Sequence, residues 1–226
     1  MQTECAKLLS IQVGKPKKLS FPASDNMPYE PFESGIVKLA VNGPVLCKKL
    51  NLVGDGQADL INHGGPDKAV LFYNAAHYPV WRDELSINNL QHGGFGENFT
   101  VLGLSESSVC IGDNYKIGDA IFEISQPRRP CWKLDKRWHR DDLLGRVEEK
   151  AWSGWYARVL IEGFVAAGDA IELIRRPLPR FTVEYVTRVV QQRKFHRDDV
   201  LELVDCSLLS ESIRRTLRKS LNRTGE

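Results

Sequence analysis

Short apolar runs, divided by glycine and asparagine turns, fill the chain from about residue 7 to residue 174. Runs of this kind are typical of an antiparallel sheet or barrel. They predict strands at residues 7–13, 36–39, 43–52, 99–101, 109–111, 115–117, 121–126 and 170–174. Because most of these runs are too short to be stable strands alone, we expect them to be joined in one mainly β structure.

Helical periodicity interrupts this pattern twice, at residues 75–85 and 150–162. Apolar and aromatic side chains recur there at helix-like spacing, with Trp81 in the first stretch and Trp152 and Trp155 in the second. Aromatic stripes on helices ordinarily bury against a sheet, and a cofactor site is the rarer use of them. We therefore expect two helices that plug or cover a barrel.

A stiff Pro-Leu-Pro linker stands at residues 177–179. Three further helical stretches follow it, at residues 183–192, 198–204 and 211–221. The chain is therefore expected to divide into a β-barrel domain over residues 1–176 and a small three-helix domain over residues 180–226.

The formal charge is unevenly placed along the chain. Residues 175–226 hold 12 Lys and Arg against 7 Asp and Glu, a net +5, whereas residues 1–174 have a net −3. A basic helical tail can contact nucleic acid or an acidic protein. This tail has neither interleaved aromatic residues nor a recognisable binding motif, so a solvated face is favoured and nucleic-acid binding is disfavoured.

The length of 226 residues, with 42% hydrophobic and 27% charged residues, is that of a globular protein that can bury a sizeable core. No apolar run approaches the roughly 20 residues that span a bilayer, and the first residues lack the order of a secretory signal. We therefore expect a cytoplasmic protein with no membrane partner. Five scattered cysteines, at positions 5, 47, 110, 131 and 206, disfavour a disulfide framework and a zinc finger.

One cysteine stands in an unusual segment. Cys131 lies in the run Ser-Gln-Pro-Arg-Arg-Pro-Cys-Trp-Lys-Leu at residues 125–134, and Asp-Lys-Arg follows at once. Nearby positive charge favours the thiolate, which is the form that attacks electrophiles and binds soft metals. We therefore expect Cys131 to be the chemical centre. The alternative is a small buried cysteine without chemistry, covered by Trp132 and Leu134.

Three other loops combine glycine with polar residues, at residues 54–59, 62–68 and 92–100. Glycine allows close backbone approach, so such loops can present amide groups to an anion such as phosphate. Each loop alone is more often a turn, and none is a Walker or dinucleotide fingerprint. Together with Cys131, however, they predict one pocket in which a carboxylate or imidazole could relay protons. Its candidate lining residues are His63, Asp67, Lys68, Glu97 and Asn98. His77, His139 and His196 have no comparable setting, and we expect them at surface or packing positions.

Four motifs, in this order, resemble the MOSC domain family. They are His-Gly-Gly-Pro-Asp-Lys-Ala at 63–69, Phe-Gly-Glu-Asn-Phe-Thr at 95–100, Ile-Gly-Asp at 111–113, and the cysteine segment at 125–134. The resemblance is greatest to the bacterial YiiM-type proteins linked to resistance against N-hydroxylaminopurine. It implies a mainly β, α+β fold, with a MOSC β-barrel and covering helices over about residues 7–174 and a small C-terminal three-helix domain.

The resemblance also implies a molybdenum cofactor, in which a molybdopterin dithiolene supplies two sulfurs and Cys131 supplies a third to the metal. In that case Arg128, Arg129 and Lys133 would hold the pterin phosphate or neutralise the anionic centre. Related amidoxime reductases place an acidic residue by the metal, which corresponds here to Glu97, or to Asn98 if the alignment shifts by one. The expected catalytic set is Cys131, Glu97 and His63. The expected cofactor-binding set is Arg128, Arg129, Lys133, Asn98, Asp67 and Lys68.

The implied reaction is the two-electron reduction of a small N-hydroxylated base or an amidoxime, which turns a hydroxylamino group into an amino group and water. The chain has no flavin, ferredoxin-type or nicotinamide motif, so we expect a separate electron-donor reductase as partner. A sulfur carrier with a persulfide on Cys131 is the alternative function. The physiological substrate, the redox partner and the oligomeric state, a homodimer included, are left open by the sequence.

Overall fold

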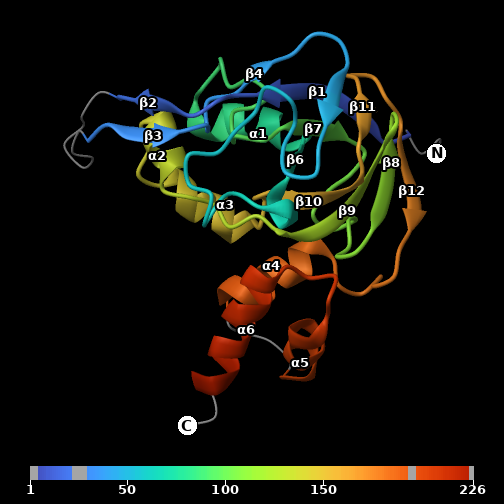
Figure 1. The fold of residues 1–226 in the computed structure, drawn as a ribbon. Helices are drawn as coiled ribbons and strands as arrows, with labels where there is room; N and C mark the ends of the chain where they lie inside the picture. The colour runs from blue at the N-terminus through green and yellow to red at the C-terminus, as the bar shows by residue number, and fades with distance from the viewer. Residues whose placement is uncertain (1–4, 22–29, 193–196, 224–226) are drawn as a thin grey trace.

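The computed structural model describes residues 5–21, 30–192 and 197–223, and within these residues eight strands form one curled mixed sheet (Figure 1). Its strands, in spatial order, are β12 (Ile171–Arg175), β8 (Asn114–Ile117), β9 (Ala120–Pro127), β10 (Trp155–Ile161), β6 (Val70–Asn74), β7 (Phe99–Leu102), β1 (Lys7–Val13) and β4 (Leu39–Ala40). Neighbouring strands are antiparallel except β6 and β7, which are parallel. The ends of the curl meet, because Lys7 bridges Ala170 and the Leu8 N–H donates to the Asp169 carbonyl at 3.0 Å.

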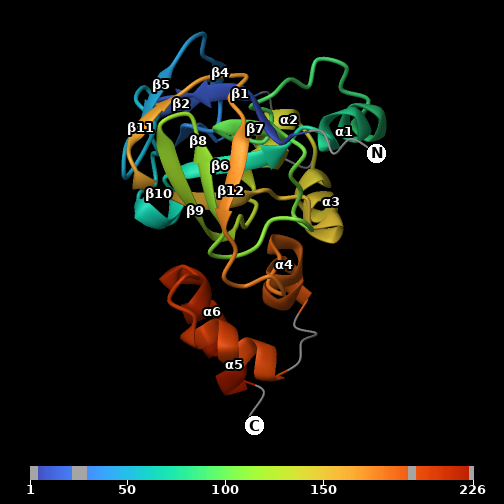
Figure 2. The same cartoon turned by 90° about the vertical axis from the view of Figure 1, so that its right-hand side faces the viewer.

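Two separate two-stranded sheets accompany this sheet among the described residues. β5 (Val45–Cys47) pairs with β11 (Gly163–Val165), and β2 (Lys17–Leu19) pairs with β3 (Phe32–Ser34). Three helices lie beside the sheet: α1 (His77–Leu85), α2 (Lys133–Trp138) and α3 (Leu143–Lys150) (Figure 2). They pack around a second hydrophobic cluster that includes Trp81, Phe95 and Leu134. This cluster supports the glycine loop before β7 and helix α2, which carry some of the predicted pocket residues.

Most of the predicted strands are confirmed. Residues 7–13, 99–101, 115–117, 121–126 and 170–174 lie in or largely overlap β1, β7, β8, β9 and β12. The prediction at 43–52 is too long, since regular strand there is limited to β5, and the prediction at 36–39 is largely wrong, because it shares only Leu39 with β4. The strand predicted at 109–111 is wrong. Val109 and Ile111 do bury in the core, but Gly112 turns the chain with φ 78°, and pairing is limited to a Cys110–Thr182 bridge.

The predicted helix at residues 150–162 is wrong, whereas the one at 75–85 is confirmed as α1. The second stretch is β10, a central strand that pairs with both β6 and β9. Burial alternates along it, from buried Trp155 to half-buried Tyr156 to buried Ala157, which is the period of a strand. Its aromatic and apolar residues match a helical period too, and the pairing with two neighbouring strands decides between the two structures.

The three predicted C-terminal helices are confirmed as α4 (Val183–Gln192), α5 (Arg197–Asp205) and α6 (Glu211–Arg223). They lie together below the sheet in both views (Figures 1 and 2). One hydrophobic cluster runs from the sheet into them, from Phe122 through Phe181 to Val186. The linker is clamped by Arg176, whose guanidinium donates to the buried carboxylate of Asp113 at 2.7 Å. The domain boundary near residues 177–179 stays a prediction.

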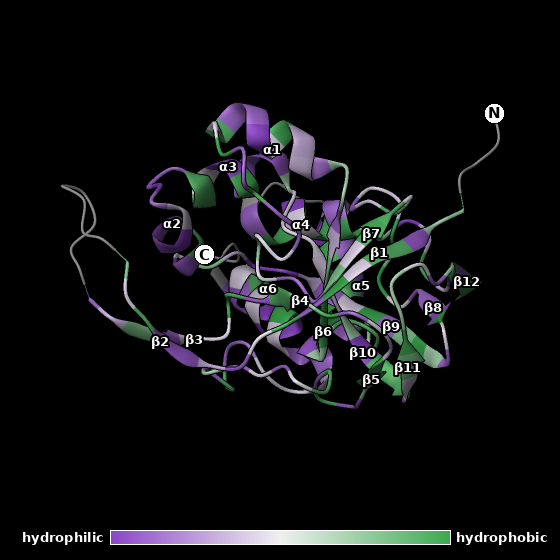
Figure 3. Ribbon diagram, turned by 90° about the horizontal axis from the view of Figure 1, so that it is seen from above, coloured by the Kyte–Doolittle hydropathy of each residue, from purple (hydrophilic) through white to green (hydrophobic). Residues whose placement is uncertain are grey.

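Among the described residues, no helix combines the length and the apolar character needed to cross a bilayer. Hydrophobic colour concentrates on strands such as β1 and β7, whereas α2 is strongly hydrophilic (Figure 3). This hydrophilic helix begins two residues after Cys131.

Replacing Phe181 with alanine tests whether the sheet and the C-terminal helices share one core. Phe181 is fully buried in the shared cluster, so Phe181→Ala is expected to lower the free energy of unfolding by about 3–5 kcal/mol, because it removes apolar contacts and leaves a cavity. Urea denaturation followed by circular dichroism measures this. The control is Phe164→Ala, at a side chain that is 53% exposed, with an expected change of about 0.5 kcal/mol or less. Equal effects of the two substitutions would contradict the shared core.

Candidate active site

A pocket of about 650 Å³, part of it open to solvent, lies beside β6, β10 and the first residue of the hydrophilic helix α2. Its walls come from residues 34–38, the glycine loops at 56–63 and 95–98, and the cysteine segment at 128–133. Leu71 of β6 and Tyr156 of β10 complete the lining, together with Lys68 at the end of the short 3₁₀ helix Pro66–Lys68. Segments that are far apart in the sequence therefore meet at one concave surface.

The structure brings most of the predicted site residues together in this pocket. Cys131 is partly exposed there, whereas Leu134 is buried in the second hydrophobic cluster and Trp132 is 48% exposed. The cysteine is thus reachable from the pocket and is not sealed within the core. The other predicted residues in the lining are His63, Lys68, Asn98, Arg128, Arg129 and Lys133.

Four of the five Lys and Arg side chains that line the pocket form no ion pair among the described residues; the fifth, Lys38, is paired with Asp55. Arg128 is 5% exposed, and its guanidinium makes one long hydrogen bond, from Nη1 to the Ser153 carbonyl at 3.5 Å. Lys68 and Lys133 donate to backbone carbonyls, at 2.6 and 3.1 Å. Within the described ranges, no carboxylate forms an ion pair with these three side chains or with Arg129. Uncompensated positive charge in a concave site favours an anionic ligand.

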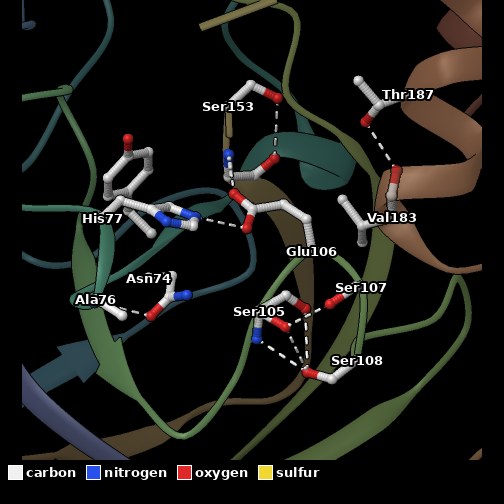
Figure 4. Close-up of polar contacts among 12 residues, drawn as sticks. Asn74, Ala76, His77, Ser105, Glu106, Ser107, Ser108, Ser153, Val183 and Thr187 are labelled. Carbon is white, nitrogen blue, oxygen red and sulfur yellow. Dashed lines mark hydrogen bonds and ion pairs between the residues drawn. The ribbon is translucent and has the colours of Figure 1, made fainter. Parts of the chain in front are cut away.

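A polar network lies directly beneath Arg128. Its backbone N–H donates to the Gly154 carbonyl at 3.0 Å, and the Gly154 N–H donates to the carboxylate of Glu106 at 3.0 Å. Glu106 also pairs with His77, whose Nε2 lies 2.8 Å from Oε2 (Figure 4). Gly154 has φ 77°, and a Cβ there would come within 2.3 Å of the Phe72 carbonyl, so glycine is required at this turn. The network supports the backbone that carries Arg128.

His63 lines the pocket as predicted, and its environment disfavours the charged imidazolium. Burial is the main cause that lowers the pKa of His63 below its usual 6.5, and the nearby charges of Lys133 and Arg128 lower it further. The carboxylate of Asp59, 3.6 Å from Nδ1, opposes this shift without cancelling it. The imidazole is therefore neutral at neutral pH, and it can accept or relay a proton.

Glu97 is fully buried and its carboxylate faces its own loop. It accepts hydrogen bonds from the N–H of Gly93 at 2.7 Å, the N–H of Phe95 at 3.1 Å and the hydroxyl of Thr100 at 2.9 Å. The hydroxyl of Tyr78 donates to the same carboxylate. Burial, followed by the charge of Glu97, raises the pKa of Tyr78. The described contacts give Glu97 the task of shaping the loop, and its catalytic role stays a prediction.

Asn98 and Asp67 are also engaged in structural contacts. The Asn98 side chain lines the pocket and donates to Asp55 at 2.8 Å, and it accepts from the N–H of Leu71 at 3.1 Å. Asp67 does not belong to the lining, and its carboxylate accepts from Nε of Arg158 at 2.6 Å. Asn98 is thus the nearer of the two to a pocket ligand.

Three residues of this region were not predicted from the sequence as site residues. Lys38 and Tyr156 line the pocket, and Asp55 holds the ammonium group of Lys38. Lys38 had a signal, because it is a charged residue inside an apolar run. Asp55 lay in one of the glycine loops, but its partner could not be read from the sequence. Tyr156 was hidden by the incorrect helix prediction.

Neither His77 nor His139, which were expected at surface or packing positions, lines the pocket. His77 is buried against Trp152, with ring centroids 4.1 Å apart, and His139 is exposed after α2. His196 lies outside the described residues. In the part of the chain that the structure describes, no three His, Cys, Asp or Glu side chains lie close enough to hold a metal ion between them.

Comparison with known proteins matches this chain to a protein family. The model of the MOSC domain matches residues 59–172, which contain all four motifs and Cys131. The protein YflK of Bacillus subtilis (strain 168) is 38% identical over 223 residues, which cover 99% of this chain and 98% of YflK. A protein named Reductase from Gibberella moniliformis (strain M3125 / FGSC 7600) is 38% identical over 189 residues, which cover 82% of this chain and 32% of that longer protein.

Among solved structures, the crystal structure of YiiM from Geobacillus stearothermophilus is similar over almost the whole chain. Its TM-score is 0.78 at 31% identity, with 96% of this chain and 99% of that chain covered. The fold and the four sequence motifs thus agree with the resemblance that the sequence indicated. The chain belongs to the MOSC domain family.

Proposed function

We propose that this protein is a cytoplasmic, molybdenum-cofactor-dependent reductase of N-hydroxylated compounds. The observation that carries the proposal is a reachable cysteine, Cys131, in a pocket where four cations have no acidic ion-pair partner among the described residues, namely Arg128, Arg129, Lys133 and Lys68. Membership of the MOSC domain family and the relative named Reductase support it.

The residues of the pocket fit an anionic cofactor that carries a soft metal. A thiolate is a soft ligand, and Cys131 is the one cysteine among the residues that line the pocket. The buried guanidinium of Arg128 offers planar, paired donors to phosphate, and Arg129, Lys133 and Lys68 add charge beside it. When bound, the molybdenum cofactor would supply the redox metal that passes two electrons to the substrate.

The chain's own residues then have separate tasks. Cys131 Sγ would bind the metal, and Arg128, Arg129 and Lys133 would hold the phosphate of the pterin. Neutral His63 would accept or relay a proton in the pocket. Apolar side chains in the same lining, from Ile36, Leu71 and Phe95, suit the flat face of a base or an amidine.

The overall reaction that we propose is R–NHOH + 2 e⁻ + 2 H⁺ → R–NH₂ + H₂O. The substrate is a small N-hydroxylated base analogue, such as N-hydroxylaminopurine, or an amidoxime, and the reaction removes its hydroxyl group. The electrons come from a separate electron-donor reductase, because no sequence motif for a flavin, nicotinamide or ferredoxin-type cluster is found in this chain.

A sulfur-carrier function is the second candidate. The same exposure of Cys131 among cations also favours a persulfide anion on that sulfur. Native mass spectrometry separates the two functions, since one additional sulfur atom on Cys131 supports the carrier and a pterin–molybdenum adduct supports the reductase.

Removing the thiol is the direct test of the proposed function. In a host that makes the cofactor, Cys131→Ala is expected to lose most of its molybdenum, and reductase activity is expected to fall by more than about a hundredfold, because one metal ligand is lost. Metal and pterin analysis beside an N-hydroxylaminopurine reduction assay measures both. Cys206→Ala, at a half-exposed cysteine between α5 and α6, is the matched control. Equal molybdenum in wild type and Cys131→Ala would reject thiolate ligation.

Arg128 is expected to lower the stability of the cofactor-free protein and to strengthen cofactor binding. Removing a buried, unpaired charge relieves desolvation, so Arg128→Met is expected to raise the free energy of unfolding by about 1 kcal/mol or more while cofactor content drops. Arg158→Met is the control, because Arg158 pairs with Asp67 and Glu123, and its loss is expected to cost about 1–3 kcal/mol. Urea titration of both cofactor-free variants measures this. An Arg128→Met variant that is as destabilised as Arg158→Met would contradict the assignment of Arg128 as an unpaired anion ligand.

The lowered pKa of His63 predicts a pH dependence of stability. Because this pKa is lower in the folded chain than in the unfolded chain, the unfolded state binds the proton more readily below pH 6.5. Stability contributed at this site is therefore lost as the pH falls from 6.5 toward the lowered pKa, and it is fully present above 6.5. His63→Gln removes this contribution, so its free energy of unfolding should fall less between pH 7 and pH 5 than that of wild type. Parallel curves for the two proteins would show that burial of His63 has no such effect.

A further inference from the structure

One pocket cation differs from the others in having an acidic partner. Lys38 lines the pocket but is 8% exposed, and its ammonium group forms an ion pair with the fully buried side chain of Asp55. The four cations beside Cys131 have no such partner among the described residues. A paired, desolvated lysine is poorly suited to binding an anionic ligand by charge, because its charge is already compensated.

Asp55 is held rigidly in place. Its carboxylate accepts the N–H of Gly14 at 2.8 Å and the side-chain amide of Asn98 at 2.8 Å, in addition to the ammonium of Lys38. Asn98 is itself anchored by the N–H of Leu71 and by the carbonyl of Gln12, at 3.1 and 3.2 Å. The ammonium group of Lys38 is therefore directed by a carboxylate that cannot move without breaking several hydrogen bonds.

The backbone before Lys38 is fixed as well. The guanidinium of Arg137, on α2, donates to the Ile36 carbonyl at 2.6 Å and to the Gly93 carbonyl at 2.8 Å. These bonds tie the segment before β4 to the glycine loop on the opposite side. Because an ammonium has three N–H donors and Asp55 accepts from one of them, Lys38 keeps donors for a molecule in the pocket.

The charged groups that face Lys38 come from three segments. They are Asp55 in the loop after β5, Glu97 in the loop before β7, and Arg137 on α2. Burial is the largest influence and lowers the pKa of Lys38 below 10.5, and Arg137 lowers it too. Asp55 and Glu97 act in the opposite direction but do not restore the usual value. Lys38 is therefore a stronger acid than a lysine on the surface.

We propose that Lys38 is the catalytic proton donor of this pocket and that Asp55 is its positioning residue, an inference that rests on the reductase function proposed above. Lys38 donates a proton to the hydroxyl oxygen of the bound N-hydroxylated substrate as the N–O bond breaks, and that oxygen leaves as water. Two electrons come from a separate reduced flavoprotein or iron–sulfur protein, and the second proton comes from solvent. Solvent then protonates the neutral amine of Lys38 again.

Other groups in the pocket are less suited to this task. His63 is neutral at neutral pH because of burial and neighbouring cations, so it holds no surplus proton to donate. Glu97 is surrounded by four donors of its own loop and scaffold. Lys68 and Lys133 belong to the set that we assign to anion binding. Lys38 combines a position in the lining, a rigid partner and an exchangeable proton.

The first experiment examines the cofactor-free protein and does not depend on reductase activity. NMR of selectively ¹³C-labelled lysine follows the titration of each ammonium group, and Lys38→Arg assigns the Lys38 signal. Lys38 is expected to lose its proton at lower pH than Lys116, an exposed lysine on β8. Asp55→Asn should lower this titration point further, because it removes the group that favours the charged form. A Lys38 signal that titrates together with Lys116 would overturn the proposal.

The second experiment uses the cofactor-loaded protein. Lys38→Arg keeps the positive charge and the ion pair, but a guanidinium does not release its proton at working pH. Molybdenum content and KM are expected to match wild type, whereas kcat should drop at least tenfold and the fall in rate at alkaline pH should disappear. Lys116→Arg is the matched control and should leave the rate unchanged.

The possible results distinguish the role of Lys38 from the reductase function on which it rests. Should Lys38→Arg not fold, the isosteric Asp55→Asn variant carries the test, and the alkaline fall in rate should then move to lower pH. An active wild type with an equally active Lys38→Arg variant overturns the role of Lys38 and leaves the reductase function standing. A cofactor-loaded wild type that reduces no N-hydroxylated compound overturns the reductase function, and the role of Lys38 with it.

Discussion

A buried positive charge without an acidic partner is the constraint around which this pocket is organised. Arg128 follows directly on β9, a strand paired on both sides, and its backbone N–H is held by the carbonyl of Gly154 at the start of β10. The side chain that this backbone carries lines the pocket and is almost fully buried. Desolvating an unpaired charge costs free energy, so an anionic ligand is the group that would offset the cost.

The rest of the fold makes such a costly arrangement tolerable. A single hydrophobic cluster extends from the curled sheet through Phe181 into the C-terminal helices, and a second cluster holds α1, α2 and α3 together. These two clusters stabilise the loops that carry Cys131, His63 and Asn98. The pair of Lys38 and Asp55 illustrates the opposite design, because there a buried charge is fully compensated and oriented. Compensated and uncompensated cations thus lie in one cavity, and they imply different chemical tasks.

Much of the fold and the identity of the pocket segments could be predicted from the sequence, but the geometry of these segments could not. Strands β1, β7, β8, β9 and β12 could be predicted because apolar runs and glycine turns are local signals. β10 could not, because its aromatic residues fit a helical period as well, and pairing with strands distant in sequence decides its structure. The cysteine segment and the glycine loops pointed to one pocket, since each carries local chemistry. The partnership of Lys38 with Asp55, and the inward direction of Glu97, depend on contacts between distant segments that no local pattern encodes.

The central claim is that the sulfur of Cys131 bonds a metal held in this cationic pocket. X-ray absorption at the molybdenum edge of the cofactor-loaded protein measures this most directly, because the fine structure counts the sulfur neighbours of the metal. In the fraction of Cys131→Ala that retains the cofactor, the metal should show one sulfur neighbour fewer than in wild type. An identical sulfur shell in the two proteins would contradict the account.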